Sequence, residues 1–307
     1  MEFKHYTVLK EEAVELLDIK EGGVYVDCTL GGAGHTELIL EKLKGGRVIG
    51  IDRDEDALRA AAERLNDDRF AAVKSNFSEL DTVLSQLNID AVDGILMDLG
   101  VSSYQLDTAE RGFSYNNEGP LDMRMDTSAP LDGAMVINGY SAEELSRIFY
   151  EYGEERYSRR IAAEIEKRRS VSPYTTTTQL YDTVYETIRG SKTDKLSSVK
   201  RVFQAVRIEV NGELSAVEDA IDKGIKLLKP QGRIAIISFH SLEDRIVKTR
   251  FGSAAKGCDC PPDLPICVCG KKPIIKLITR KPVLPSQKEL AENSRSHSAK
   301  LRCGEKI

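Results

Sequence analysis

A glycine-rich turn between two apolar segments most constrains the fold of this chain. The sequence VYVDCTLGGAGH over residues 24–35 and the sequence IGID over residues 49–52 predict a strand, a glycine turn, a helix and a second strand that ends in an acid. Glycines after a first strand let a ligand approach the backbone closely, and an acid at the tip of the next strand can bind both hydroxyls of a ribose. The pattern therefore predicts half of a nucleoside-binding site.

Further strand and helix patterns extend this segment into a parallel sheet. Apolar runs predict strands, and apolar residues at three- and four-residue spacings between them predict crossover helices. The expected strands cover residues 24–28, 47–51, 70–74, 94–97 and 233–238, and the expected helices cover residues 35–43, 55–65, 77–87 and 214–228. A Lys-Pro-Gln-Gly turn is expected at residues 229–232, before the last strand. The fold class is therefore α/β.

A helical segment interrupts the strand pattern. Residues 104–134 are rich in Gly, Pro, Asp and Asn without a clear period, so we predict a long loop there. Residues 141–210 carry helical periodicity and no strand alternation. Ser141 and Glu144 fit the capping box of a helix N-terminus.

The domain organisation follows from this interruption. A half-sheet of four strands needs the later strand to cover its other edge, so the two α/β segments belong together. We predict one discontinuous α/β domain over residues 1–108 and 212–307, split by an inserted helical domain over residues 109–211.

Charge is distributed unevenly along the chain, whose net charge is -5. Residues 1–100 hold 11 Lys and Arg against 21 Asp and Glu, residues 155–207 hold 12 against 6, and residues 245–307 hold 14 against 5. Solvated helix faces would explain the two basic segments, and so would a surface that docks on phosphates. Such an asymmetry suits a protein that binds a polyanion.

No segment predicts export or membrane insertion. The first 17 residues mix charges with apolar positions at helical spacing, unlike a secretory signal, and no apolar run approaches the length that spans a bilayer. Six cysteines without export favour reduced thiols. We therefore expect a cytoplasmic protein that does not associate with a membrane.

The glycine turn does not match the common nucleotide motifs. A dinucleotide dehydrogenase would show a third glycine after Gly32 and Gly34, but residues 38–39 are Leu and Ile, and no Walker lysine follows. S-adenosylmethionine (SAM) remains the best candidate, because it needs only a cramped turn for its methionine end and an acid for its ribose. We expect Asp52 to bind the ribose and Asp27 to help at the methionine end.

Polar residues for chemistry are expected at the same edge of the sheet. Asp98 ends the fourth strand, and the sequence SFHSLEDR after the fifth strand places Ser238 and His240 near it. Asp98 would orient an exocyclic amine that accepts a methyl group, or would only cap the following turn. His240 would position the substrate, or would be structural. The catalytic candidates are Asp98, Ser238 and His240.

Two Cys-x-Cys pairs stand apart from these motifs in a Pro-rich segment. Cys258 and Cys260 form the first pair, and Cys267 and Cys269 form the second. Four thiolates could hold a tetrahedral zinc ion, although Cys-x-Cys is tighter than the usual Cys-x-x-Cys knuckle. Free thiols in a loop are the other interpretation. We therefore leave the zinc question open and assign no metal ligand.

These motifs together resemble those of the MraW-type (RsmH) methyltransferases, which use SAM to modify N4 of a cytidine in bacterial 16S ribosomal RNA. Matching segments are spread over nearly the whole chain: DCTLGGAGH from Asp27, IGIDRD from Ile49, MDLGVSS from Met97, PLDMRMD from Pro120, FQAVRIEVNGEL from Phe203, SFHSLEDR from Ser238 and SAKLR from Ser298. The resemblance implies a class I SAM-dependent methyltransferase fold, Rossmann-like, with an inserted helical domain that recognises the substrate.

The resemblance also implies the cofactor contacts. Matched position by position, they fall on Ala33, Gly34, His35, Asp52, Phe77, Asp98 and Gln105. Phe77 would stack on the adenine of SAM, and would otherwise belong to the core.

The implied substrate is a cytidine in the decoding region (P site) of 16S rRNA in the small ribosomal subunit. Because an RNA base must leave its stack to meet the methyl group, a flipped cytidine is expected. The phosphates would be bound by the basic C-terminal tail and by five arginines of the insertion: Arg156, Arg159, Arg160, Arg168 and Arg169. A non-catalytic SAM-binding ribosome-assembly factor is the alternative function, and the sequence leaves open whether two copies form a homodimer.

Overall fold

The computed structural model describes residues 7–258, 260, 266 and 268–307. The chain divides into two compact units. The sheet unit consists of Met1–Gly100 and Leu214–Ile307, and the helical unit of Val101–Glu213. The boundaries between the units fall after residues 100 and 213, whereas the sequence predicted boundaries after residues 108 and 211.

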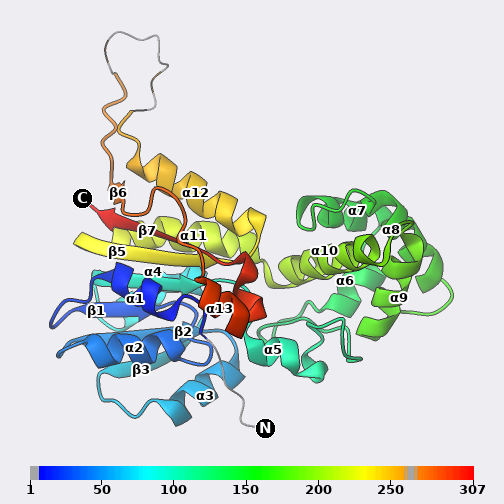
Figure 1. Ribbon diagram of the computed structural model, residues 1–307, viewed down its shortest axis with the longest axis horizontal. Coiled ribbons are helices and arrows are strands. Elements are labelled where there is room, and N and C mark those ends of the chain that lie inside the picture. The colour runs from blue at the N-terminus through cyan, green and yellow to red at the C-terminus, as the bar shows by residue number, and fades with distance from the viewer. Residues whose placement is uncertain (1–6, 259, 261–265, 267) are drawn as a thin grey trace. The chain divides into compact units, whose positions relative to one another are not determined.

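A seven-stranded sheet forms the centre of the sheet unit (Figure 1). Its strands are β1 Val24–Asp27, β2 Arg47–Asp52, β3 Phe70–Lys74, β4 Val92–Asp98, β5 Leu228–Ser238, β6 Ile275–Leu277 and β7 Lys300–Lys306. Strands β1 to β5 pair in parallel, whereas β7 runs antiparallel to both β5 and β6. The five predicted strands are confirmed, and β6 and β7 are additions that the sequence analysis does not contain.

The order of the strands reverses beside β1. The sheet order is β3-β2-β1-β4-β5-β7-β6, so the chain winds outward from β1 to β3 and then returns to the other side of β1. Open α/β sheets bind ligands at such a switch point, beyond the carboxyl ends of the strands. Asp27 ends β1 and Asp98 ends β4, so both acids lie at this point.

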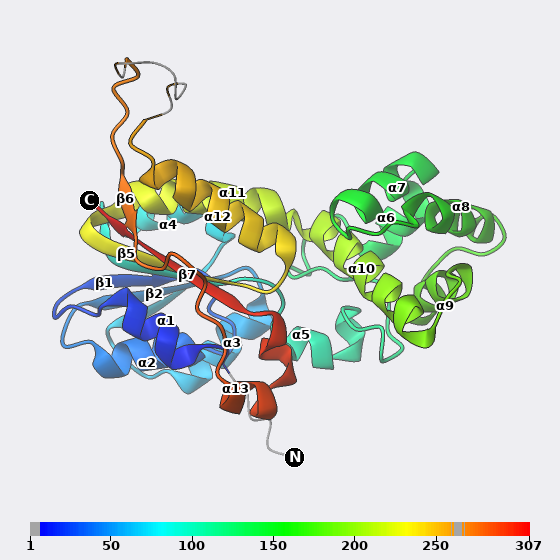
Figure 2. The ribbon, with the colours of Figure 1, turned by 45° about the horizontal axis from the view of Figure 1, so that its top comes forward.

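Helices cover both faces of the sheet (Figures 1 and 2). One face carries α1 Lys10–Leu17, α2 Gly34–Lys42 and α3 Glu55–Arg64, and the other carries α4 Leu80–Gln86, α11 Glu213–Leu227 and α12 Ser241–Ala255. Val14 and Leu38 pack on the first face, and Val83, Ile221 and Phe251 pack on the second. Since both faces are covered, the central strands are apolar on both sides, as in other parallel sheets.

The helical unit is built without a strand. Its helices are α5 Ser103–Asp107, α6 Gly133–Gly139, α7 Ala142–Glu151, α8 Ser158–Arg169, α9 Thr177–Thr187 and α10 Lys192–Asn211, with the 3-10 turn η2 Ala109–Arg111. The predicted capping box of α7 is confirmed, because Ser141 and Glu144 each accept a hydrogen bond from the other's backbone N–H. Among all described residues, no helix is long and apolar enough to cross a membrane.

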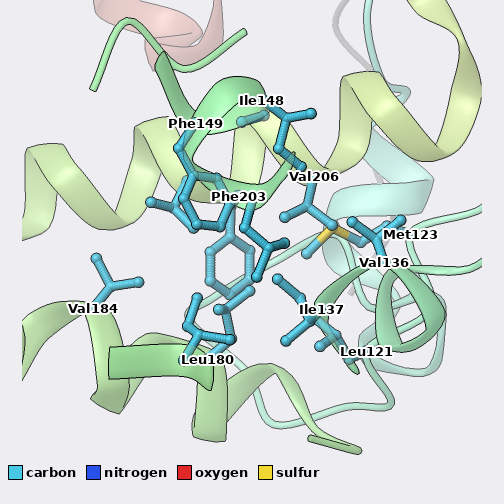
Figure 3. Packing of buried hydrophobic residues seen from close by; sticks show 14 of the residues in the cluster. Leu121, Met123, Val136, Ile137, Ile148, Phe149, Leu180, Val184, Phe203 and Val206 are labelled. Atoms are coloured by element: carbon cyan, nitrogen blue, oxygen red, sulfur yellow. The ribbon is translucent and has the colours of Figure 1, made fainter. Parts of the chain in front are cut away.

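A separate apolar core holds the helical unit together (Figure 3). Phe149 of α7, Leu180 of α9 and Phe203 and Val206 of α10 meet in this core. The side chains converge because α10 presents apolar residues at three- and four-residue spacing toward its neighbours. A core of its own is what an inserted domain needs in order to fold as a body.

Two sequence-based expectations about local structure are wrong. Residues 104–134 do not form one loop, because α5 begins at Ser103 and α6 begins at Gly133. A capping box at Ser102 stabilises α5 within a segment whose composition otherwise favours turns. The expected turn at 229–232 lies inside β5, where the register against β4 shifts and Gln231 adopts φ 63°. These residues form a bulge in the strand.

Two adjacent glycines before β2 provide a matched test of backbone packing. Both have positive φ, but a Cβ at Gly46 would lie 2.1 Å from the carbonyl oxygen of Gly23, whereas a Cβ at Gly45 meets nothing closer than 4.0 Å. We expect Gly45→Ala to lower the free energy of unfolding by about 1 kcal/mol through left-handed strain. Gly46→Ala should cost about 3 kcal/mol or more, because backbone atoms must also move. Denaturant unfolding measures both values, and equal losses would contradict the packing described here.

Candidate active site

The glycine turn after β1 is held in a fixed and partly strained conformation. Ala33 is the N-cap of α2 with φ 60°, a left-handed conformation that is uncommon for alanine, and its methyl group is fully buried. Arg64 of α3 donates from Nη1 to the carbonyl oxygen of Gly32 at 2.7 Å. A Cβ on Gly34 would lie 1.8 Å from Thr7 Oγ1, so a larger residue there would require Thr7 to move. Strain of this kind persists where the surrounding structure enforces it, as at ligand sites.

Asp52 joins the end of β2 to the glycine turn. Its Oδ2 accepts a hydrogen bond from the N–H of Gly31 at 2.9 Å, and its Oδ1 accepts one from the N–H of Asp54 at 2.9 Å. Burial raises the pKa of Asp52 above its ordinary value, and these two hydrogen bonds oppose the rise. A carboxylate has about four acceptor positions, so Asp52 retains capacity for ribose hydroxyls.

Asp27 is a buried acid at the end of β1. Its Oδ1 accepts a hydrogen bond from the N–H of Thr29 at 3.1 Å, and its Oδ2 accepts one from Thr36 Oγ1 at 2.7 Å. Burial raises the pKa of Asp27 to about 6 in spite of these donors. The side chain fastens the turn to α2, and its expected role at the methionine end of SAM stays a prediction.

Asp98 has a hydrogen-bonded backbone N–H and a carboxyl oxygen that lacks a hydrogen-bond partner among the described residues. Its N–H donates to Thr29 Oγ1 at 2.6 Å, which ties the end of β4 to the glycine turn. Its Oδ2 lies 3.9 Å from His35 Nδ1, while its Oδ1 is buried and has no hydrogen-bond partner among the described residues. An unpaired buried carboxyl oxygen is costly unless a ligand supplies the missing partner.

The surroundings of Asp98 favour a cationic ligand. Burial raises the pKa of Asp98 well above its ordinary value, and the nearby carboxyl groups of Asp27, Glu243 and Glu289 raise it further. A positive charge placed among these acids would be stabilised by all of them. The sulfonium of SAM carries such a charge, so the residues present fit this cofactor.

Ser238 and His240 follow β5, as expected, and take part in the local structure. Ser238 is buried and donates from Oγ to the carbonyl oxygen of Lys300 at 3.4 Å. His240 caps α12, since its Nδ1 accepts a hydrogen bond from the N–H of Glu243 at 3.5 Å. Its Nε2 lies 3.1 Å from Glu243 Oε1 without the alignment of a hydrogen bond. Their catalytic roles stay predictions beside these structural ones.

Phe77 and Gln105 also have structural contacts. Phe77 opens the 3-10 turn η1 Phe77–Glu79 after β3, is half-buried, and packs against the apolar cluster that includes α4 and α11. Gln105 belongs to the helical unit, where its Oε1 accepts a hydrogen bond from the N–H of Ser102 at 3.0 Å as part of the cap of α5. Stacking of Phe77 on adenine and a cofactor contact by Gln105 stay predictions.

Several supporting residues have no signal in the sequence spacing. Thr29 and Thr36 orient the acids described above. Glu289 of α13 Gln287–Glu292 accepts a hydrogen bond from the N–H of Leu9 at 2.8 Å, which brings the C-terminal segment to the start of α1. Contacts between residues so far apart in sequence become visible only in the folded chain.

Two of the sequence motifs meet through an ion pair. Asp244 of the SFHSLEDR segment lies 2.7 Å from Arg302 Nε and 3.3 Å from Lys300 Nζ, and both partners belong to SAKLR. Burial disfavours the ionised form of Asp244, yet the hydrogen bond from Arg302 and the charges of both partners lower its pKa overall. The two segments therefore form one structural element beside β5.

The fold and the site define the class of this protein. A sheet in the order β3-β2-β1-β4-β5-β7-β6 with β7 antiparallel, and with acids at the carboxyl ends of β1, β2 and β4, is that of a class I SAM-dependent methyltransferase. The chain belongs to the MraW methylase family, whose model matches residues 2–307. Its cofactor is SAM, and the resemblance that the sequence motifs indicate is confirmed.

Curated relatives match along their whole length. The chain is 53% identical over 309 residues to ribosomal RNA small subunit methyltransferase H of Carboxydothermus hydrogenoformans, covering 100% of this chain and 99% of the relative. It is 51% identical over 311 residues to the protein of that name from Brevibacillus brevis, again covering 100% and 99%. A putative rRNA methylase from Clostridium thermocellum, known from its crystal structure, aligns over 99% of this chain and 100% of its own with 14% identity and a TM-score of 0.45, too remote to support an inference.

The buried carboxyl of Asp27 makes stability depend on pH. The folded protein holds the Asp27 proton up to about pH 6, whereas the unfolded chain loses it near 3.8, so ionisation costs stability as the pH rises through this window. Asp27→Asn removes the cost and keeps both contacts, because the Thr36 hydroxyl can accept from the new amide. Between pH 4 and pH 7.5 the stability of the variant should gain about 2.5 kcal/mol relative to the wild type. Denaturant unfolding at the two pH values tests this, and a difference that does not change with pH would contradict it.

Proposed function

We propose that this methyltransferase transfers the methyl group of SAM to N4 of a cytidine in the decoding region (P site) of 16S rRNA in the small ribosomal subunit. The names of the curated relatives support small-subunit ribosomal RNA as the substrate. The observation that carries the choice of an amine is Asp98, whose unpaired carboxyl oxygen at the end of β4 can accept an N–H.

The chemistry requires an acceptor at this place. The exocyclic amine of cytosine is a weak nucleophile, because its lone pair is conjugated with the ring. Asp98 would accept one of its N–H groups and hold the nitrogen in line with the methyl group, which SAM supplies from its sulfonium. The new N–C bond forms as the S–C bond breaks, and the nitrogen then releases one proton, to Asp98 or to water.

Exposed arginines of the helical unit would bind the RNA phosphates in this proposal. Arg156, Arg159 and Arg160 precede or open α8 and are exposed, and the guanidinium of Arg156 lies 4.8 Å from the ring centre of Tyr157. Exposed guanidinium groups can pair with phosphate without first giving up a protein partner.

Arg168 and Arg169 are less suited to this role. Arg168 forms ion pairs with Glu164 at 2.8 Å and with Glu186 at 2.9 Å, and Arg169 donates to the carbonyl oxygen of Ile137 at 2.7 Å. These contacts connect α8 to α9 and to α6, so we propose that the two arginines stabilise the helical unit. The sequence pattern alone does not distinguish these two arginines from the three that are proposed to bind phosphate.

Removal of the Asp98 carboxylate tests the reaction. Asp98→Asn should lower the rate of methyl transfer to small-subunit RNA at least about 100-fold while SAM binding is partly retained. The matched control is Asp90→Asn, an exposed residue two positions before β4, which should keep full activity. Labelled SAM and small ribosomal subunits provide the assay. Full activity of Asp98→Asn would overturn the assigned role, and SAM binding without any label in RNA from the wild type would favour a non-catalytic assembly factor.

The raised pKa of Asp98 also predicts a pH dependence. Because the carboxylate form accepts the amine N–H, activity should fall as the pH drops through a pKa well above the ordinary value for aspartate. Asp98→Asn should lose this acidic limb of the rate profile.

Nucleoside analysis of small-subunit RNA from cells with and without the protein identifies the product, which should be N4-methylated cytidine.

The arginines differ in their expected effect on RNA affinity. Arg160→Ala should weaken binding of small-subunit RNA and reduce the slope of log K against log salt by about 1, because one phosphate contact is lost. Arg147→Ala removes the same charge from α7, where Arg147 is paired with Glu151 at 3.1 Å, and should leave the slope unchanged. Salt titrations of binding compare the two variants, and equal slopes would remove Arg160 from the RNA contact.

A further inference from the structure

Three cysteine sulfurs converge in the segment between α12 and β6. The Sγ atoms of Cys258, Cys260 and Cys269 all lie within 4.8 Å of one another. Figure 1 shows the described parts of this segment leaving the sheet unit beyond the end of α12 and returning to β6. None of the residues discussed for SAM or for RNA belongs to it, so the proposed methyl transfer does not explain the cluster.

The spacing of the sulfurs fits a tetrahedral metal site. The Sγ atoms of Cys258 and Cys269 are 3.7 Å apart, far beyond the bond length of about 2.05 Å in a disulfide. Four sulfurs at about 2.3 Å from a zinc ion in a tetrahedron are separated by about 3.8 Å from one another. The Cys258–Cys269 pair therefore already has the separation that zinc ligands need.

The backbone around the cluster also favours a thiolate. The N–H of Cys260 donates to Cys258 Sγ at 3.3 Å, a contact that stabilises negative charge on sulfur. Gly270 adopts φ 63° directly after Cys269, so the chain turns sharply behind the third sulfur. Lys271 and Lys272 follow and bring positive charge to an anionic metal–thiolate group.

Apolar packing does not account for the convergence. Ile266 and Val268, the two large apolar side chains described between the cysteines, are 74% and 77% exposed. Apolar side chains as exposed as these two contribute little to stability, and a bound metal ion is a common alternative source in small elements. Zinc suits a cluster of thiolates better than the hard cations that prefer oxygen ligands.

We propose that Cys258, Cys260 and Cys269 are ligands of a structural zinc ion that closes the segment between α12 and β6. Each thiol releases one proton as its sulfur binds the ion. Cys267, the remaining cysteine of the two Cys-x-Cys pairs, lies outside the described part of the chain. The ion would hold the two ends of the segment together.

Metal analysis of the full-length protein, purified without chelators, tests the proposal. We expect one zinc ion per chain that survives dialysis, and loss of at least about nine-tenths of it in Cys258→Ser and in Cys269→Ser. The control is Cys303→Ser, a buried cysteine of β7 outside the cluster, which should retain the zinc. Circular dichroism of each variant confirms that it is folded. Folded wild-type protein that is free of zinc and takes up none on titration would overturn the proposal, as would full zinc content in Cys258→Ser.

A second measurement reports the structural role directly. Lys256 and Lys271 flank the cluster and are sites for trypsin. Removal of zinc by a chelator should increase the rate of cleavage at these lysines several-fold, and addition of zinc should restore protection. Cleavage that is indifferent to zinc would contradict a structural role. Zinc content and tryptic cleavage are both independent of methyl transfer, so they test the zinc site separately from the proposed function.

Discussion

The burial of acids at the carboxyl ends of parallel strands is the constraint on which the site depends. Asp27, Asp52 and Asp98 end neighbouring strands, and each must meet its need for hydrogen-bond donors where water has little access. Asp27 and Asp52 are satisfied by donors from the glycine turn, from α2 and from the residue that caps α3. Asp98 is satisfied only at its backbone, by Thr29. One carboxyl group is thus left in need of a partner, at the point where the strand order reverses.

The same turn therefore serves structure and function. The left-handed Ala33, the close approach of Gly34 to Thr7 and the contact of Arg64 with Gly32 fix the path of the backbone. A fixed backbone places N–H groups and acids before any ligand arrives, so that little reorganisation is needed on binding. This explains why capping and tethering contacts occupy so many of the residues expected to touch the cofactor.

The C-terminal segment completes the sheet unit. Strand β7 pairs antiparallel with β5, and the ion pair between Asp244 and Arg302 joins the start of α12 to that strand. Glu289 of α13 accepts a hydrogen bond from the backbone N–H of Leu9, so α13 lies beside the start of α1. Antiparallel pairing of the last strand needs no crossover helix, which lets a short segment cover the edge of β5.

The sequence by itself determined the five parallel strands, the helical insertion, the capping box at Ser141 and the family, because periodicity, glycine turns and motifs are local properties. It also identified Asp27, Asp52 and Asp98, since an acid that ends a strand is visible in the pattern. Only the tertiary structure decided that Asp98 keeps an unpaired oxygen, that Arg168 is held by Glu164 and Glu186, and that three cysteines converge. These properties depend on partners that are distant along the chain or on other elements, and burial is set by everything that packs around a group. Short elements such as α5 and β6 were not predicted, because their few residues carry too little periodicity. A capping box stabilises α5, and pairing with β7 stabilises β6.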